Sequence, residues 1–279
     1  MEQCTIHIKA RTGWFDVDLK ELYQYKDLIF LFVKRNYTTR YKQTILGPLW
    51  LIFNPLLTVS LYALVFGNIA GLSTDGTPHF LFYLCSNAIW AYFATCITET
   101  SNTFIINAGI MGKVYFPRLV MPISAVLTGI LDLLIQMFML MAAVIMYAFI
   151  GVQIHIGWQI WFVPILILQT ALLGLGFGII IASLTTRYRD LMVLVSFGVQ
   201  LWMYVTPVVY ATSTIPEELY GIYMLNPMAT IVTVWRSIIL GIGEIPWKYW
   251  GISGAVTLII LVLGVILFSK IEKTFMDTV

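Results

Sequence analysis

Long runs of apolar residues, separated by short clusters of charge, set the pattern of this chain. A run of about 20 nearly uncharged residues is long enough for an α-helix to cross the hydrocarbon core of a bilayer. Six such runs occur, at residues 45–70, 80–108, 119–150, 157–184, 191–211 and 249–268. The pattern therefore predicts an all-α integral membrane protein with six transmembrane helices.

The composition supports this prediction. Of 279 residues, 59% are hydrophobic and 11% are charged, whereas soluble domains carry about 25% charged residues. This charge is too little to cover a soluble globule, and it also excludes a disordered chain or a nucleic-acid-binding domain. The 3 cysteines, Cys4, Cys85 and Cys96, are not spaced for a disulfide framework or a metal site.

Lys and Arg are distributed unevenly between the segments that connect the predicted spans. If the N-terminus is cytoplasmic, 14 of the 16 cations lie in cytoplasmic segments, and the outer loops hold Arg236 and Lys248. Cytoplasmic loops of membrane proteins are enriched in Lys and Arg. The sequence thus predicts a multi-pass protein of the cytoplasmic (inner) membrane with both termini in the cytoplasm.

Residues 1–44 are predicted to form a cytoplasmic segment before a membrane domain of residues 45–279. Asp18 and Glu21 have the spacing of a capping box at the start of a helix. Apolar residues then recur at helical spacing, namely Leu19, Leu22, Tyr23, Phe30, Val33, Tyr37 and Tyr41. We expect an amphipathic helix in the inner membrane interface, either as a plain surface anchor or as a docking element.

The outer segment between the fifth and sixth predicted spans is unusually apolar. Pro216 suits the start of a short helix, and Asn226-Pro227 suits the start of a second one. Residues 228–240 are apolar apart from Arg236, but this run is too short to cross the membrane. The sequence therefore predicts a re-entrant or interfacial helix pair rather than a collapsed loop.

The sequence shows no constellation of catalytic or metal-binding residues. The three histidines, His7, His79 and His155, are scattered, and none has a second His or Cys at metal spacing. Residues 109–113 lack the first glycine and the Ser or Thr of a phosphate-binding loop. Three glycines in one apolar span, Gly174, Gly176 and Gly178, predict close packing of helices.

Two acids, Glu99 and Asp132, interrupt otherwise uncharged spans. Charge inside a membrane is costly and is often functional. Neither acid has a cation in its own span, and two acids make a poor proton relay. A structural or pore-facing role is therefore favoured over ion coupling, and the chain is expected to be a conduit whose energy source lies elsewhere.

Several motifs together resemble one family of transporters. Residues 33–50 read VKRNYTTRYKQTILGPLW, and Phe53-Asn54-Pro55 follows. Further stretches read KVYFPR at 113–118 with Pro122, LWMYVTPVVY at 201–210, LNPM at 225–228 with Arg236 and Gly241, and EKTFMD at 272–277. In this order, over roughly residues 20–279, they resemble the ABC-2 type permeases that export O-antigen, capsule and teichoic acid polysaccharides.

The resemblance implies how such a protein is assembled and driven. Permeases of this family work as homodimers with two copies of a separate ATPase subunit, so ATP and magnesium would be bound by the partner and no cofactor by this chain. The chain would then be a transport subunit rather than an enzyme. The candidate contacts with the ATPase are Arg35, Arg40, Tyr41, Lys42, Lys113, Tyr115 and Arg118. The alternative is that these cations follow the topology rule and contact lipid headgroups.

The resemblance also implies a lipid-linked polysaccharide as cargo. Aromatic faces pack against the C–H faces of sugars without fixing a register, and the candidates for this path are Trp50, Trp90, Tyr92, Trp202, Tyr204 and Tyr210. Lys34 and Arg35 are the candidates for binding the pyrophosphate head of the lipid. Asn226, Pro227 and Arg236 are the candidates for an outer gate. The alternative for the aromatic residues is the ordinary belt of Trp and Tyr at membrane interfaces.

Two other functions stay open at this point. An ABC-2 exporter of small hydrophobic drugs or lipids would share the fold. A membrane enzyme acting on lipid-linked sugars would need an acid and base pair that the sequence does not show.

Overall fold

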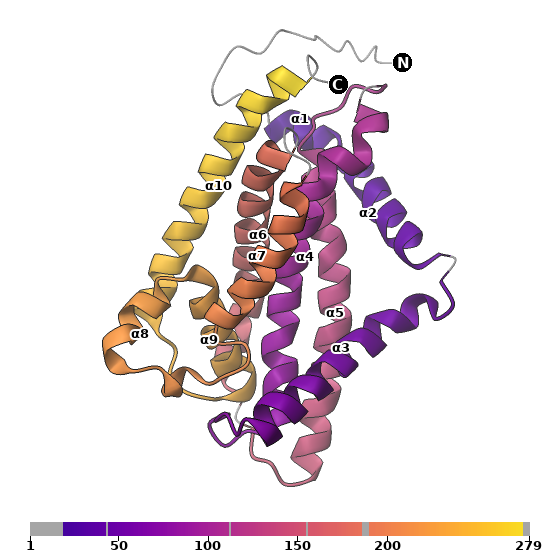
Figure 1. Ribbon diagram of the computed structural model, residues 1–279. Helices are drawn as coiled ribbons and strands as arrows, with labels where there is room; N and C mark the ends of the chain where they lie inside the picture. The colour runs from indigo at the N-terminus through magenta and orange to yellow at the C-terminus, as the bar shows by residue number, and fades with distance from the viewer. Residues whose placement is uncertain (1–18, 43, 112, 155, 186–189, 276–279) are drawn as a thin grey trace.

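The computed structural model describes residues 19–42, 44–111, 113–154, 156–185 and 190–275. Within these ranges the secondary structure is helical and contains no strand (Figure 1). The α-helices are α1 (Leu19–Gln24), α2 (Lys26–Tyr41), α3 (Trp50–Tyr62), α4 (His79–Met111), α5 (Val120–Phe149), α6 (Val163–Thr185), α7 (Leu191–Val205), α8 (Glu217–Met224), α9 (Pro227–Leu240) and α10 (Trp247–Phe275). Short turns of 3-10 helix occur at Gly47–Leu49, Trp158–Phe162 and Thr212–Thr214, and α3 continues as the π-helix Ala63–Ile69. The fold is therefore all-α, as predicted.

Five of the predicted spans are helical segments long and apolar enough to cross a membrane. They are Gly47–Ile69, His79–Met111, Val120–Phe149, Trp158–Thr185 and Trp247–Ser269. The predicted fifth span, 191–211, is helical only as far as Val205. Its 15 residues measure about 22 Å, short of the roughly 30 Å of a hydrocarbon core. The helix ends there because Thr206 precedes Pro207, and the α conformation is disfavoured for such a residue.

The predicted outer helix pair is present as α8 and α9, whose axes are bent by 104° relative to each other. α8 begins directly after Pro216, and α9 begins at Pro227. The side chain of Asn226 accepts a hydrogen bond from the backbone N–H of Met228 and caps α9. Gly241 ends α9 in the left-handed conformation, with a φ of 69°, which glycine adopts without strain.

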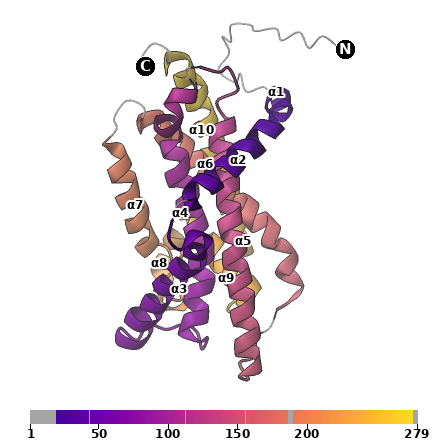
Figure 2. The ribbon, with the colours of Figure 1, turned by 90° about the vertical axis from the view of Figure 1, so that its right-hand side faces the viewer.

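α4 is the central helix of the bundle (Figures 1 and 2). In the most apolar stretch of 18 residues in α4, 78% of the residues are buried inside the protein, compared with 22% in the corresponding stretch of α10. Helices α3, α5, α6, α7 and α9 all pack against it. Its N-terminal half carries the core, with fully buried side chains such as Phe82, Tyr83 and Phe93.

The three glycines of α6 lie at helix contacts, which confirms the predicted close packing. A Cβ added at Gly174 would come within 2.5 Å of Cys96 Cβ on α4, and one at Gly178 within 2.5 Å of Thr100 Cβ. On another face of α6, a Cβ at Gly176 would approach the backbone of Leu261 on α10 to 3.0 Å. Small residues thus let α6 contact both neighbours at backbone distance.

Helix α2 is present as predicted, and part of its apolar surface packs against the bundle. Ile29 and Phe32 are buried in a second core cluster with Phe104 of α4 and Met121 of α5, so α2 packs against the bundle. Other residues of the predicted apolar face are exposed, with Tyr23 of α1 at 70% and Phe30 of α2 at 66%. Apolar residues occur on more than one side of this helix. The side that meets the bundle carries Tyr25, Leu28, Ile29 and Phe32, which follow the spacing i, i+3, i+4, i+7.

The glycine contacts lead to a test of the fold. Gly178→Val should lower the thermal unfolding midpoint of the purified protein, because overpacking a filled contact costs about 1–3 kcal/mol. The matched control is Gly198→Val in α7, where a Cβ would meet nothing within 4 Å. Equal unfolding midpoints for the two variants would contradict the packing of α6 on α4.

Candidate functional site

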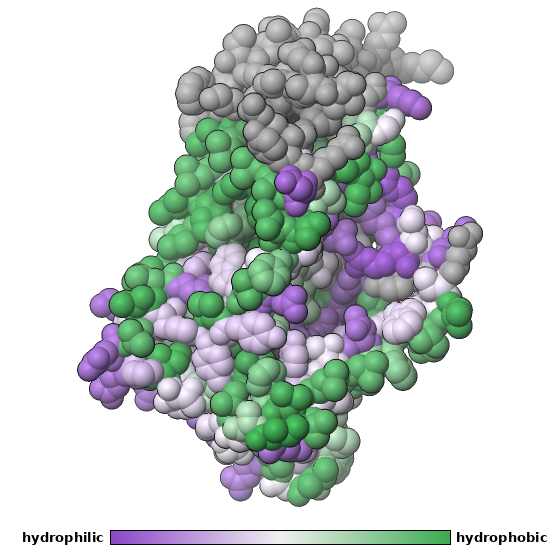
Figure 3. All heavy atoms as spheres, in the orientation of Figure 1, coloured by the Kyte–Doolittle hydropathy of each residue, from purple (hydrophilic) through white to green (hydrophobic). Residues whose placement is uncertain are grey.

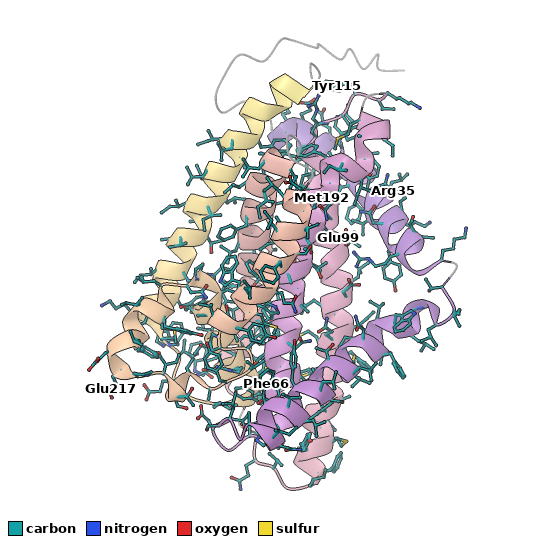
Figure 4. The ribbon with its side chains drawn as sticks, in the orientation of Figure 1. Arg35, Phe66, Glu99, Tyr115, Met192 and Glu217 are labelled. Carbon is teal, nitrogen blue, oxygen red and sulfur yellow. The ribbon has the colours of Figure 1, made fainter. Side chains whose placement is uncertain are left out.

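A cluster of three charged side chains joins α2 to α4 and α5. Arg40 Nη2 donates to Glu99 Oε1 at 2.7 Å, and Arg40 Nη1 donates to Asp132 Oδ2 at 2.7 Å. The arginine thus supplies the cation that each acid lacks in its own span. Figure 4 shows Glu99 on the side of α4 that faces α2. Both acids therefore have an ion-pair partner on α2.

The cluster is partly shielded from solvent and carries net charge. The side chains of Arg40, Glu99 and Asp132 are 28%, 42% and 16% exposed. A planar guanidinium can donate to two carboxylates at once in a fixed geometry, which a lysine ammonium cannot match. With two carboxylates for one guanidinium, the formal charge of the cluster is negative. It fixes the C-terminal end of α2 against two membrane helices.

Beside this cluster, a cavity of about 420 Å³ lies between α3, α4 and α5. Its lining residues are Arg40, Trp50, Leu51, Asn54, Pro55, Thr58, Asn87, Ala91, Tyr92, Thr95, Asp132 and Gln136. Figure 3 shows polar side chains gathered on the side of the molecule where α2 and α3 leave the bundle. A polar hollow between apolar helices is unusual, because such helices normally bury polar groups only where those groups are hydrogen-bonded to each other.

Neutral hydrogen-bonding groups dominate the polar lining. Gln136 is 6% exposed, and its Oε1 atom has no hydrogen-bond partner among the described residues. A buried acceptor without a partner destabilises the fold unless the cavity supplies a donor. Asn54, Asn87 and Thr95 add further amide and hydroxyl groups. The cavity is therefore suited to a ligand with many neutral hydroxyl groups.

Two of the six predicted path aromatics, Trp50 and Tyr92, line this cavity. Trp90 and Trp202 instead belong to the core, where both rings contact Phe93, at centroid distances of 5.5 and 5.2 Å. Tyr204 is 47% exposed on α7, and its backbone oxygen accepts a hydrogen bond from Tyr210 Oη at 3.1 Å. The structure thus brings two of the candidates together and distributes the other four elsewhere.

The predicted gate residues connect α9 to the chain that follows α7. Asn226 Oδ1 accepts from Trp202 Nε1 at 3.2 Å, and Asn226 Nδ2 donates to Thr206 Oγ1 at 3.2 Å. Pro227 is the first residue of α9. Arg236 is 3% exposed, and its Nη1 donates to the backbone oxygens of Pro207 and Tyr210 at 2.7 and 3.2 Å. These contacts hold residues 206–210 against α9.

The candidate contacts with an ATPase fall into two groups. Lys113, Tyr115 and Arg118 lie in the turn between α4 and α5, with Lys113 and Tyr115 exposed. Figure 4 places Tyr115 at the end of the molecule where α1 and the C-terminal end of α10 lie in Figure 1. Lys42 is exposed at the end of α2, whereas the side chain of Tyr41 lies outside the described residues.

Arg35 and Lys34 differ in their surroundings although they are neighbours on α2. Arg35 Nη2 donates to Asn107 Oδ1 on α4 at 2.7 Å, and its guanidinium lies 4.7 Å from the centre of the Phe32 ring. Partial burial lowers the pKa of Arg35 from its ordinary value. Lys34 is exposed. Arg35 therefore helps to hold α2 on α4, and Lys34 faces outward.

Sequence reasoning missed the polar lining, although a signal for it exists. Trp50, Asn54 and Thr58 are spaced by four on α3. Asn87, Ala91, Thr95 and Glu99 are spaced by four on α4, and Asp132 and Gln136 on α5. Residues four apart lie on one face of a helix, so a search for polar residues at this spacing would have found the three cavity walls.

The charge cluster leads to a double-mutant test. Arg40→Gln should destabilise the protein more than Asp132→Asn does, because it leaves two carboxylates facing each other without a cation. The double variant should be less destabilised than the sum, with an interaction energy of about 0.5–3 kcal/mol, measured by thermal unfolding in detergent. The control pair is Arg40→Gln with Glu217→Gln, which are far apart and should add within about 0.5 kcal/mol. Additivity of both pairs would contradict the contact.

Comparison with known proteins identifies the family. A model of the ABC-2 type transporter family matches residues 27–240. An O-antigen export system permease protein RfbA from Klebsiella pneumoniae is 30% identical over 252 residues, which cover 90% of this chain and 94% of the relative. An RfbA protein from Myxococcus xanthus is 29% identical over 225 residues, covering 79% of this chain and 83% of the relative. The chain belongs to the ABC-2 type transporter family.

Proposed function

We propose that this protein is the membrane-spanning permease subunit of an ATP-driven transporter that exports a lipid-linked cell-surface polysaccharide of the O-antigen type. The names of its relatives supply the class of cargo. The observation that carries the proposal is the cavity between α3, α4 and α5, which offers neutral polar groups and two aromatic faces inside a bundle of apolar helices. A path for small hydrophobic drugs would have an apolar lining instead.

The energy for export comes from a separate ATPase subunit, which binds ATP and magnesium. Two copies of this permease pair with two ATPase subunits about a common two-fold axis. The exposed turn with Lys113 and Tyr115, together with Arg118 and Lys42, forms the contact surface. Arg40 faces the bundle, so we assign it to transmitting movement from the ATPase contact surface to the membrane helices. Through its bonds to Glu99 and Asp132, a displacement of α2 moves α4 and α5 together.

The cargo follows a path from α2 to the outer helix pair. Lys34 and Arg35 attract the pyrophosphate head of the lipid at the inner interface, while the polyprenyl tail stays in lipid. The glycan then passes Trp50 and Tyr92, with Tyr204 and Tyr210 further along. Helices α8 and α9 close the exit, and Asn226 and Arg236 hold them to the end of α7.

The orientation that this path requires places both termini in the cytoplasm and the α8–α9 pair on the outer side of the inner membrane. The two ends of the molecule differ as this orientation demands. Figure 4 shows Tyr115 and Glu217 toward opposite ends of the bundle. The acidic residues Asp75, Glu217 and Glu244 all border one pocket, which would open outward.

An export assay tests the function. In cells that lack their own permease and are complemented with this protein and its ATPase, Trp50→Ala should reduce surface polymer about two- to tenfold, the loss expected from one aromatic contact. The matched control is Trp161→Ala, whose side chain is 80% exposed and does not border the cavity. Equal export by the two variants would remove Trp50 from the path.

Cysteine labelling tests the orientation. In a Cys4→Ser background, Glu217→Cys should react with a membrane-impermeant thiol reagent in intact cells, because Glu217 is exposed at the outer end. Tyr115→Cys should react only after the cells are permeabilised. The remaining thiols, Cys85 and Cys96, are buried and provide a low background. Labelling of Tyr115→Cys in intact cells would reverse the proposed orientation.

A further inference from the structure

Beyond the cations of α2, carboxylates outnumber cations along the proposed path, beginning at the inner cavity. Arg40 and Asp132 line that cavity, and Glu99 shares the same guanidinium. Both terminal nitrogens of Arg40, Nη1 and Nη2, already donate hydrogen bonds to these carboxylates at 2.7 Å. An anionic group entering the cavity would therefore meet an excess of carboxylate around a cation that is already paired.

The rest of the cavity wall is neutral and matches hydroxyl groups. Gln136 Oε1 is a buried acceptor without a described partner, and it can accept a hydrogen bond from a hydroxyl but not from a phosphate diester or a carboxylate. Asn54 and Asn87 border the same space with amides, which both donate and accept. A sugar hydroxyl satisfies each of these groups, because it also donates and accepts.

The outer end of the path, like the inner cavity, has more carboxylates than cations. A pocket of about 440 Å³ is bordered by Asp75, Glu217 and Glu244, and by the cation Arg236. The Arg236 guanidinium is directed into the fold, where it donates to backbone oxygens and lies 4.5 Å from the centre of the Phe82 ring. Glu244 also borders a neighbouring hollow of about 840 Å³. Asp75 Oδ1 already accepts a hydrogen bond from Ser213 Oγ at 2.6 Å. The pocket thus presents the exposed carboxylates of Glu217 and Glu244 to a passing chain, while its cation is buried.

These walls select against a polymer of like charge. Like charges brought together where little water screens them repel each other, and the repulsion recurs with every repeat of a polyanion. On the basis of the function proposed above, we infer that the exported polymer is an uncharged polysaccharide, and that chains with a carboxylate or phosphate in each repeat are rejected. The cations on α2 then serve the lipid head, which enters once, and the glycan itself needs no cation.

The experiment compares two polymers in the same transporter. Two host strains without their own permease are used, one making a neutral hexose polymer and one making a polymer with one carboxylate per repeat, both on polyprenyl pyrophosphate. Each receives this permease with its ATPase, and surface polymer is measured with antibodies. The neutral polymer should reach the surface, and the anionic one should reach it at least about tenfold less, as expected when like charges meet.

Variants of the outer pocket test whether its carboxylates cause the selection against anionic polymer. Glu217→Gln with Glu244→Gln should raise the ratio of anionic to neutral polymer at the surface. Glu218→Gln, which changes a neighbouring exposed acid that does not border the pocket, should leave the ratio unchanged. A higher ratio with Glu218→Gln alone would indicate a general surface effect and overturn the assignment to the pocket.

The possible outcomes separate this inference from the proposed function. Equal export of both polymers, or preferred export of the anionic one, would overturn the inference while supporting a polysaccharide permease. Export of neither polymer by a complex that hydrolyses ATP would count against the proposed function itself.

Discussion

At two successive turns α6 lies so close to α4 that no side chain fits between them, and the arrangement of the other helices depends on this contact. Gly174 lies against Cys96, and Gly178 against Thr100. Lipid tails are as apolar as the helices, so close packing and hydrogen bonds must hold such a bundle together. With one face of α4 occupied by α6, its remaining faces are left for α3, α5, α7 and α9. The contact with α6 thus fixes the rotation of α4 about its own axis, and this rotation determines where each polar residue of α4 lies.

The rotation of α4 places its polar stripe opposite α2, α3 and α5. Asn87 and Thr95 therefore border the cavity, and Glu99 at the end of the stripe meets Arg40. Charge at this depth is costly unless it is paired, so the same stripe that provides a polar wall also requires a cation from outside the span. The cavity and the connection between α2 and the bundle are thus two consequences of one helix face.

Much of the fold could be predicted from the sequence, because spans, helix starts and glycine contacts depend on residues close together in the chain. Pro216, Asn226 and Gly178 are examples whose local chemistry determined the outcome. The contact of Arg40 with Glu99 and Asp132 could not be predicted, since 59 and 92 residues separate the partners. Trp50 and Trp202 look alike in sequence, yet one lines a cavity and the other packs against Phe93 and Phe177. Only the tilt and rotation of neighbouring helices distinguish them.

The charge cluster also constrains the order in which the chain can be built into a membrane. Arg40 is synthesised before Glu99, and Glu99 before Asp132, so each acid is threaded into the bilayer as part of an apolar segment. On the scale of the insertion machinery, an acid near the middle of such a segment costs about 2.5–3.5 kcal/mol. Arg40 precedes the first span and can neutralise Glu99 once α4 is inserted. The complete cluster, with Asp132 as well, forms only after α5 is inserted. The contacts that hold α2 on the bundle therefore begin with α4, through Asn107 and Glu99, and are completed only when the third span brings Asp132 to Arg40.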